Sequence, residues 1–344
     1  MTTPGMKHPT DVLIIGAGIT GLMAASQLAA RGLTVTLLDK GRGVGGRMAT
    51  RRVGPGRADH GAQFFTVRHP TFLEWVDRWH NQNLIFQWST GWSDGSLGQS
   101  PPDGHPRFAV HGGMTNLSKR LAADLKEQGG SLHTDTRVTA LSVDRGGWHV
   151  QSERGEIWTS RAVVITTPVP QGLALLDAGK AQLAIDQRIA LETVRYAPCL
   201  CALIWVDGKV GLPNPGALQQ PLHTVAWIAD NRRKGISPEA TILTLHGEPA
   251  WSEANFTASD DALQAHFLEE LQPWLNVAAH VQEIQIMRWR YALPVQLYPE
   301  RFLRADGLPP LYFGGDAFGA PRVEGAVLSG LAIGEALADQ IALV

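Results

Sequence analysis

The first clear pattern of apolar positions is a short run at residues 11–15 that leads directly into glycines. Apolar residues then recur at helical spacing at Leu22, Ala25, Leu28 and Ala29. Gly32 stands where a helix usually ends, and residues 33–38 form a second apolar run that ends at Asp39. This order predicts a strand, a tight turn, a helix and a second strand, which together make a βαβ unit.

Later patterns predict further elements of both kinds. A helix is predicted at residues 117–128, where leucine recurs every four residues, with Thr115 or Asn116 as its cap and Gly129 at its end. Strands are predicted at 136–143 and 148–152, joined by a turn at 144–147, and at 162–166. The first half of the chain is therefore expected to be an α/β domain.

At about residue 170 the pattern changes to strands separated by loops. Strands are predicted at 199–206, 223–229 and 241–246, and an amphipathic helix at 259–271 with Ser259 as its cap. A strand at 311–313 and a final helix starting near Val323 follow. Residues 91–105, rich in Pro and Gly, predict a long loop. The change predicts a second sheet, separate from the first.

Composition limits the functions that fit this organisation. The 344 residues exceed what one domain usually needs, and 44% hydrophobic with 18% charged residues is typical of globular proteins. A formal net charge of -2 provides no excess of Lys and Arg, so no nucleic-acid partner is expected. The apolar stretch 326–344 contains Glu335 and Asp339, which predicts a buried terminal helix and no membrane span.

The two cysteines, Cys199 and Cys201, are predicted to be reduced thiols. Their spacing in an apolar run places both side chains on one face of a strand, and no partner ligands for a metal lie nearby in the sequence. No N-terminal stretch is apolar enough for a signal peptide. These features predict a cytoplasmic protein without a metal site.

The strongest motif is the glycine turn after the first strand. Gly16, Gly18 and Gly21 have the G-x-G-x-x-G spacing, between a predicted strand and a predicted helix. Gly16 permits the tight turn, Gly18 admits a pyrophosphate, and Gly21 allows close packing of the helix. Asp39 follows at about the 20-residue offset of the acid that binds ribose hydroxyls. The motif predicts a dinucleotide site but leaves NAD and FAD open.

Two later segments favour FAD. The residues Gly45, Gly46 and Arg47 add flexible amides and a guanidinium that suits a pyrophosphate. A later apolar strand also ends in an acid, in the run Leu311-Tyr312-Phe313-Gly314-Gly315-Asp316, and a glycine-containing helix follows it. An acid and a helix N-terminus there would suit the longer flavin cofactor.

These motifs, with several further segments, have a known counterpart. The segments are Thr166-Thr167-Pro168, DHGAQFF (59–65), WIADN (227–231), LH (245–246) followed by WS (251–252), RWRYA (288–292) and RVEG (322–325). Together they resemble the flavin amine oxidase superfamily, and within it the bacterial renalase-like proteins. The matches span nearly the whole chain.

The resemblance implies an α/β fold in which a Rossmann-type FAD-binding domain carries an inserted α+β substrate domain, as in amine oxidases and p-hydroxybenzoate hydroxylase. The FAD-binding domain would comprise residues 1–70, 106–170 and 285–344, and the substrate domain residues 71–105 and 171–284. It also implies non-covalent FAD and the following contacts: Gly16, Gly18, Gly21, Asp39, Lys40, Gly45, Gly46, Arg47, Gln63, Val138, Thr167, Gly315, Asp316, Val323, Glu324 and Gly325.

The implied reaction is oxidation of the 2- and 6-dihydro isomers of NAD(P)H to NAD(P)+, with O2 reduced to hydrogen peroxide. Such substrates are already hydride donors, so positioning dominates and no nucleophile is required. His246, Asn231, Trp289 and Gln63 are the expected substrate-site residues. A histidine that ends an apolar strand and a tryptophan between two arginines also occur as packing residues, so the sequence leaves both roles open.

Other functions stay open at this point. Amine oxidases of the superfamily often carry a lysine near the flavin, but residues 284–294 contain Arg288 and Arg290 and no lysine. Cys199 and Cys201 lie outside the C-terminal segment where covalent attachment occurs in monoamine oxidases. Amine oxidation, a non-catalytic FAD-binding protein and an NAD-dependent dehydrogenase are the alternatives.

Overall fold

The structure is a computed structural model that describes residues 9–94, 104–144 and 147–342. The chain divides into two compact units. Unit 1 comprises Met1–Gly46, Ser118–Arg195 and Pro294–Val344, and unit 2 comprises Arg47–Leu117 and Tyr196–Leu293. Each unit is therefore assembled from segments that are far apart in the sequence.

Unit 1 is built on a mostly parallel sheet with the order β16-β17-β10-β1-β2-β7, and β9 pairs with β10 and β8 with β9. Its strands are β1 (Thr10–Ile15), β2 (Val35–Leu38), β7 (Ser131–His133), β8 (Val138–Asp144), β9 (Gly147–Ser152), β10 (Ile157–Ile165), β16 (Phe302–Arg304) and β17 (Leu311–Gly314). β1, β2, β10 and β17 run parallel, with Ile15 paired to both Leu38 and Ile165. Their carboxyl ends therefore meet at one edge of the sheet.

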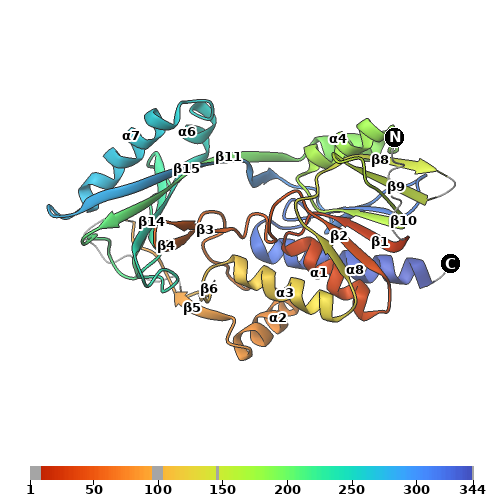
Figure 1. Cartoon of the computed structure of the whole chain (residues 1–344), viewed down its shortest axis with the longest axis horizontal. Coiled ribbons are helices and arrows are strands. Elements are labelled where there is room, and N and C mark those ends of the chain that lie inside the picture. Colours follow the sequence, from red (N-terminus) through yellow and green to blue (C-terminus); the bar gives the residue numbers. More distant parts are fainter. Residues whose placement is uncertain (1–8, 95–103, 145–146, 343–344) are drawn as a thin grey trace. The chain divides into compact units, whose positions relative to one another are not determined.

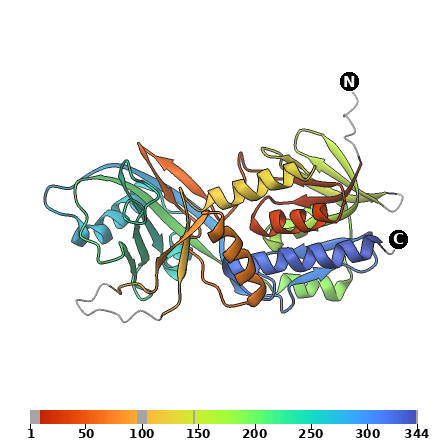
Figure 2. The ribbon, with the colours of Figure 1, turned by 90° about the horizontal axis from the view of Figure 1, so that it is seen from below.

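The helices of this part are α1 (Ile19–Ala30), α3 (Thr115–Glu127), α4 (Val169–Gly179), α5 (Ile185–Glu192) and α8 (Arg322–Ala342). α1 and α8 lie side by side (Figures 1 and 2). Gly330 permits this approach, because a Cβ there would lie 2.4 Å from the carbonyl oxygen of Thr20. The Thr20 hydroxyl also donates a hydrogen bond to Ala326 O at 2.9 Å. The first and last helices of the chain are therefore tied together.

Unit 2 contains a second sheet with the order β12-β13-β14-β11-β15 (Figure 1). The strands are β11 (Arg195–Asp207), β12 (Ala217–Gln219), β13 (Val225–Asp230), β14 (Thr241–Gly247) and β15 (His280–Gln296). Two hairpins, β3 (Thr50–Val53) with β4 (Gly56–Asp59) and β5 (Ile85–Ser89) with β6 (Arg107–Val110), accompany it. Its helical segments are α2 (Pro70–Asn81), α6 (Pro249–Ala254), α7 (Asp260–Leu271) and the 3-10 turn η1 (Gln272–Trp274).

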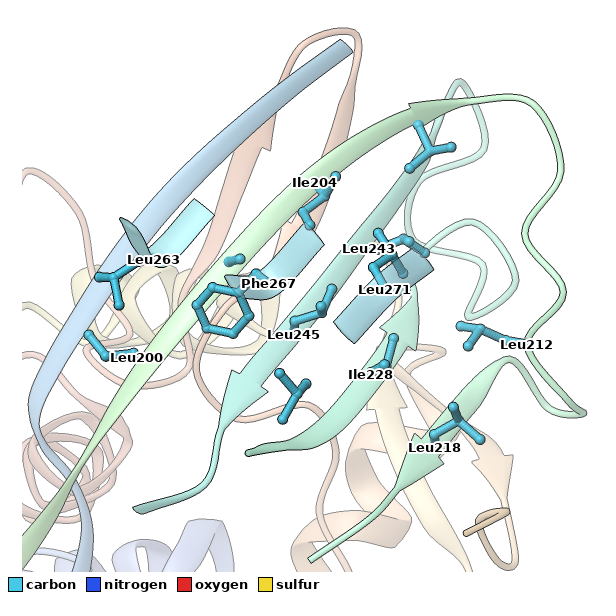
Figure 3. Close-up of a cluster of buried hydrophobic side chains, with 13 residues drawn as sticks. Leu200, Ile204, Leu212, Leu218, Ile228, Leu243, Leu245, Leu263, Phe267 and Leu271 are labelled. Carbon is cyan, nitrogen blue, oxygen red and sulfur yellow. The ribbon is translucent and has the colours of Figure 1, made fainter. Parts of the chain in front are cut away.

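Alternation of side chains along the strands gives this sheet two different faces. One face carries Leu200, Ile204 and Leu245, which pack against Leu263 and Phe267 of α7 (Figure 3). The other face carries Cys201, Leu203 and Ile242, which pack against Val53 and Ala58 of the β3–β4 hairpin. This second face also carries Thr244 and His246, because β14 residues alternate between the faces.

The main elements predicted from the sequence are present, with ends shifted by a few residues. Ser259 caps α7 and accepts a hydrogen bond from Ala262 N at 3.3 Å, as predicted. Part of the predicted turn, residues 145–146, and part of the predicted loop, residues 95–103, lie outside the described residues. No helix in the described ranges is long and apolar enough to span a membrane.

The predicted domain boundaries differ from the two compact units. Residues 47–70, 106–117 and 285–293 lie in unit 2, and residues 171–195 lie in unit 1. The β3–β4 hairpin packs on the second sheet through Val53 and Ala58. α4 packs on β8 so closely that a Cβ at Gly179 would lie 1.8 Å from Leu141 O. These contacts join residues that are distant in sequence.

Candidate active site

The glycine turn of unit 1 has the geometry that its motif predicts. Gly16 has a φ of +107°, a conformation that favours glycine. A Cβ at Gly21 would lie 2.0 Å from Gly16 O, whereas a Cβ at Gly18 would meet no heavy atom within 4 Å. Gly21 therefore serves packing of α1, and Gly18 borders open space.

Asp39 follows β2 and stabilises this turn through hydrogen bonds to backbone N–H groups. Its Oδ2 accepts a hydrogen bond from Ala17 N at 2.7 Å, and its Oδ1 accepts one from Gly41 N at 2.6 Å. Gly45 N donates to Ala17 O at 2.8 Å, which brings Gly45 and Gly46 beside the turn. Each carboxylate oxygen keeps a second lone pair that can accept a ribose hydroxyl.

Other predicted cofactor residues of unit 1 follow the carboxyl ends of β10 and β17. The Thr167 hydroxyl is enclosed and has no hydrogen-bond partner among the described residues. Gly315 has a φ of +145° and no heavy atom within 4 Å of a Cβ position, and Asp316 follows at 9% exposure. Gly325 packs α8 against Ala320, whose carbonyl oxygen would lie 1.7 Å from a Cβ.

The remaining residues predicted to contact FAD differ in their burial and in their hydrogen-bond partners. Val138 and Val323 are buried, and Glu324 lies in the first turn of α8. Lys40 Nζ donates to Gln171 Oε1 at 3.2 Å. Arg47 and Gln63 belong to unit 2, where Arg47 Nη1 donates to Tyr291 O at 3.3 Å.

These residues fit a flavin dinucleotide. Open space adjoins Gly18 and Gly315, which follow different strands of the same sheet edge, and the Thr167 hydroxyl between them in the strand order lacks a partner. In open α/β sheets, ligands bind outside the carboxyl ends of the strands. In the described residues no group of three or more His, Cys, Asp or Glu side chains is placed to hold a metal ion.

The four predicted substrate-site residues all lie in unit 2 and gather around the segment Asp59-His60-Gly61. Asn231 is fully buried, and its Oδ1 accepts from Asp59 N at 3.3 Å. Its Nδ2 donates to Ile242 O and to Thr244 Oγ1, both at 2.9 Å. Both the oxygen and the nitrogen of the Asn231 amide therefore help to hold β4 to the second sheet.

Gln63 and His246 each present an enclosed hydrogen-bond acceptor without a partner in the described structure. Gln63 Nε2 donates to Asp59 O at 2.7 Å and to Gly61 O at 3.2 Å. Because both partners are carbonyl oxygens, the amide nitrogen must face them, and Gln63 Oε1 is left unpartnered. His246 makes a hydrogen bond to the backbone of His60, and its Nε2 is unpartnered.

Burial keeps the His246 ring neutral. Its pKa is lowered to about 4, mainly by loss of solvent and also by the charges of His60 and Lys234, and the hydrogen bond to the His60 backbone opposes these effects. A neutral ring whose Nδ1 donates to a carbonyl has no proton on Nε2. The Nε2 atom of His246 is therefore an acceptor at neutral pH.

Trp289 supplies a fixed aromatic ring to the same cluster. Its Nε1 donates to His60 O at 2.9 Å, and its ring stacks on that of His60 with centroids 5.2 Å apart. Burial, with the charge of Arg51, also lowers the pKa of His60 to about 4. Trp289 thus both packs on the His60 ring and donates a hydrogen bond to the His60 backbone.

Sequence reasoning missed Lys234, which lies in this cluster. Its side chain and that of Asp59 are both 0% exposed, and their Nζ and Oδ2 atoms are 2.6 Å apart. Burial lowers the pKa of Lys234, and Asp59 opposes that effect. A lysine in the run Asp230-Asn231-Arg232-Arg233-Lys234 is typical of an exposed turn, so nothing in the sequence marked it as buried.

Comparison with known proteins gives two family matches. Residues 80–337 match the family described as flavin containing amine oxidoreductase, and residues 14–79 match the NAD(P)-binding Rossmann-like domain. The chain belongs to the flavin-containing amine oxidoreductase family. It is therefore an FAD-dependent oxidoreductase, as the sequence predicted.

The relatives of this family member include Renalase from Mus musculus, which is 24% identical over 94% of this chain and 97% of that protein. The predicted renalase-like resemblance is thus confirmed. Coproporphyrinogen III oxidase from Mycobacterium tuberculosis is 29% identical, over 55% of this chain and 43% of that protein.

Solved structures confirm the predicted fold class. A putative protoporphyrinogen oxidase from Exiguobacterium sp. 255-15 is similar with a TM-score of 0.75 and 15% identity, over 98% of this chain and 100% of that chain. Cyclohexylamine oxidase from Brevibacterium oxydans is similar with a TM-score of 0.72 and 15% identity, over 96% and 99%. At such identities the likeness concerns the fold alone.

Proposed function

We propose that this family member oxidises 2- or 6-dihydro isomers of NAD(P)H, with unit 1 holding FAD and unit 2 holding the substrate. The substrate, O2 and one proton would give NAD(P)+ and hydrogen peroxide. Bound FAD would supply the chemistry by accepting the hydride and passing the electron pair to O2. The protein's own residues would bind and orient the substrate and exclude water.

The observation that carries this proposal is the pair of enclosed acceptors, Gln63 Oε1 and His246 Nε2, attached to the same segment. A buried polar atom without a partner costs about 1–3 kcal/mol. The carboxamide of a nicotinamide has two N–H donors, which could satisfy two such acceptors. Both acceptors are neutral, in agreement with a neutral dihydropyridine as the substrate.

The charges of the cluster favour a neutral substrate over an ammonium. Asp59 is the carboxylate nearest to Gln63 along the chain, and both of its oxygens are engaged, Oδ1 by Thr50 and Met114 and Oδ2 by Lys234. It therefore has little capacity left to pair with a protonated amine. A dihydropyridine needs no counter-ion and no base to become a hydride donor.

Trp289 would provide the surface for the planar ring. Its indole is fixed by the bond to His60 O, so little conformational entropy remains to be lost on stacking. The amide of Asn231 bonds to other residues of the protein. Asn231 would therefore position the segment Asp59-His60-Gly61 and make no contact with the substrate itself.

Anaerobic mixing of the FAD-loaded protein with 6-dihydro-NAD tests the proposal. We expect the flavin absorbance to bleach within seconds, while a Gln63→Met variant shows a raised substrate concentration for half-maximal rate. Ordinary NADH, with its hydride at the 4 position, is the matched control ligand. Flavin that stays oxidised with 6-dihydro-NAD and is reduced by a primary or secondary amine would establish the amine oxidase alternative instead.

A non-catalytic role for bound FAD is the remaining alternative. Oxygen consumption with a panel of reduced nicotinamides, amines and porphyrinogens distinguishes it, since a purely structural flavin would give no turnover with any of them. Porphyrinogens belong in the panel because coproporphyrinogen III oxidase is among the similar proteins.

A further inference from the structure

Lys234 is a fully buried cation to which the proposed reaction assigns no role. Its Nζ donates to Asp59 Oδ2 at 2.6 Å and to the backbone oxygen of Gln63 at 2.5 Å. The same Nζ lies 4.8 Å from the centroid of the Trp88 ring, a cation–π distance. The ammonium is therefore surrounded by three specific partners.

These bonds tie Gln63 to Asp59 twice. The Gln63 side chain donates directly to Asp59 O at 2.7 Å, and its backbone carbonyl is linked through Lys234 to the Asp59 carboxylate. Asp59 is itself fixed, since its Oδ1 accepts from Thr50 Oγ1 at 2.6 Å and from Met114 N at 2.8 Å. Lys234 thus holds the backbone of the residue that carries the unpartnered Oε1 atom.

Stability alone does not account for this buried pair. Replacing both partners of a buried ion pair by neutral residues of similar size is often neutral or stabilising, whereas removing one partner is strongly destabilising. Folding stability by itself therefore gives no reason to bury Lys234 and Asp59 in preference to an uncharged pair. Their bonds also connect the two ends of the segment Asp59-His60-Gly61-Ala62-Gln63 through the Lys234 ammonium.

We propose that Lys234 is a positioning residue that acts through the backbone carbonyl of Gln63 and directs Gln63 Oε1 toward the N–H donors of the substrate's carboxamide. The identity of that substrate rests on the proposed function. The positioning of Gln63 does not.

The test deletes the pair together, as Lys234→Met with Asp59→Asn, so that neither charge is left buried alone. The introduced asparagine would keep an acceptor oxygen for Thr50 and Met114. We expect hydrogen exchange of residues 59–65 to accelerate about tenfold, while β11 and β14 keep their protection. We also expect the Kd of NAD+, measured by calorimetry on the FAD-loaded protein, to rise about tenfold.

Arg288→Met with Asp260→Asn is the matched control, because it deletes a partly exposed ion pair in the same unit. It is expected to leave exchange of residues 59–65 and the Kd of NAD+ unchanged. Lys234→Arg provides a second variant that retains the charge beside Asp59. A planar guanidinium cannot reproduce the compact ammonium donor to Gln63 O, so the same two changes are expected there with the fold intact.

A double-mutant cycle with Gln63→Met distinguishes positioning of Gln63 by Lys234 from a general effect of Lys234 on packing. If Lys234 acts through Gln63, deleting the pair in the Gln63→Met background raises the KM for 6-dihydro-NAD no further. A full additional increase would overturn the proposal, as would unchanged exchange of residues 59–65. If 6-dihydro-NAD fails to reduce the wild-type flavin, the proposed function fails, and the exchange measurement still decides whether Lys234 positions Gln63.

Discussion

At the scale of single residues, the buried polar atoms fall into two groups. Asp59 and Asn231 have every oxygen engaged by other residues, and these bonds hold β4 and β14 together. Gln63 Oε1, His246 Nε2 and Thr167 Oγ1 are enclosed without a partner in the described residues. The second group has the capacity to bind a ligand, because its hydrogen-bonding potential is unused.

Asp39→Ala is expected to weaken FAD binding by about 1–3 kcal/mol, through loss of an acceptor for the ribose. The substitution also removes the acceptors of Ala17 N and Gly41 N, so the glycine turn becomes less ordered. Asp39→Asn, which keeps one acceptor oxygen, should lose less. Flavin content after dialysis measures the effect, and full occupancy in Asp39→Ala would contradict the role given to this acid.

The buried histidines His60 and His246 predict a pH dependence of stability. The ordinary pKa of 6.5 applies to the unfolded chain, whereas the folded His246 binds a proton only below about 4. Between these values the unfolded state binds more protons, so the free energy of unfolding falls as the pH drops from 6.5 to 4 and is level above 6.5. The loss is at most about 3 kcal/mol for one histidine.

Urea unfolding at pH 7 and pH 4.5 measures this dependence. His246→Gln should reduce the difference between the two pH values, while His223→Gln, at an exposed position, should leave it unchanged. An equal pH dependence in wild type and His246→Gln would show that the His246 ring is not kept neutral by burial.

At the scale of elements, the turn between β1 and α1 assigns different tasks to glycines two or three positions apart. Gly16 adopts a positive φ, Gly21 is pressed against Gly16 O, and Gly18 borders open space with an ordinary φ of −74°. The same motif therefore contains residues that the fold requires and one that only a ligand requires.

Substitution of these glycines by alanine should separate folding from cofactor binding. Gly18→Ala meets no protein atom, so the unfolding free energy of the FAD-free protein should stay within about 1 kcal/mol of wild type while FAD binding weakens. Gly21→Ala should destabilise even the FAD-free protein, because its Cβ would lie 2.0 Å from Gly16 O. Denaturation of the FAD-free protein tests the stability predictions, and flavin titration tests the binding prediction. If Gly18→Ala binds FAD as tightly as the wild type does, the pyrophosphate does not bind at this turn.

The long edge strand β15 illustrates how tertiary contacts override a local pattern. No element was predicted from the sequence for its 17 residues, and in the structure all of them except Pro294 are exposed or half-buried. Pairing with β11 supplies its backbone hydrogen bonds, and Trp289 anchors it through His60 O. An edge strand gains its stability from its neighbours more than from its own propensity.

At the scale of the whole molecule, the residues predicted to contact the cofactor and the substrate come from two units that are interleaved in sequence. The glycine turn, Asp39, Gly315 and Asp316 belong to unit 1, whereas Gln63, His246 and Trp289 belong to unit 2. Both units contain segments from each half of the chain, so neither could be recognised as one continuous stretch.

We predict that the flavin is released intact when the whole protein is denatured. Cys199 and Cys201 lie on β11, and burial raises the pKa of Cys199 to about 12 and that of Cys201 well above its usual value. Both stay protonated and are poor nucleophiles toward a flavin methyl group. Heat or acid precipitation should leave a yellow supernatant and a colourless pellet; flavin fluorescence in the denatured polypeptide would contradict this.

The sequence by itself determined the features that depend on neighbouring residues. The glycine spacing, the acid after β2 and the alternation of apolar strands are local, because turn geometry and side-chain periodicity act over a few residues. They sufficed for the α/β class and the dinucleotide turn, and the family resemblance pointed to Gln63, Trp289 and His246.

The tertiary structure decided what depends on contacts across long separations. It placed Asn231 in a structural bond with Asp59, left acceptors unpartnered at Gln63 and His246, and buried Lys234 against a carboxylate 175 positions away. Whether a charged residue is exposed or paired depends on which chain segment covers it, and a charged turn has the same local pattern in both cases. That covering segment, Asp59 to Gln63, is fixed only when the chain folds.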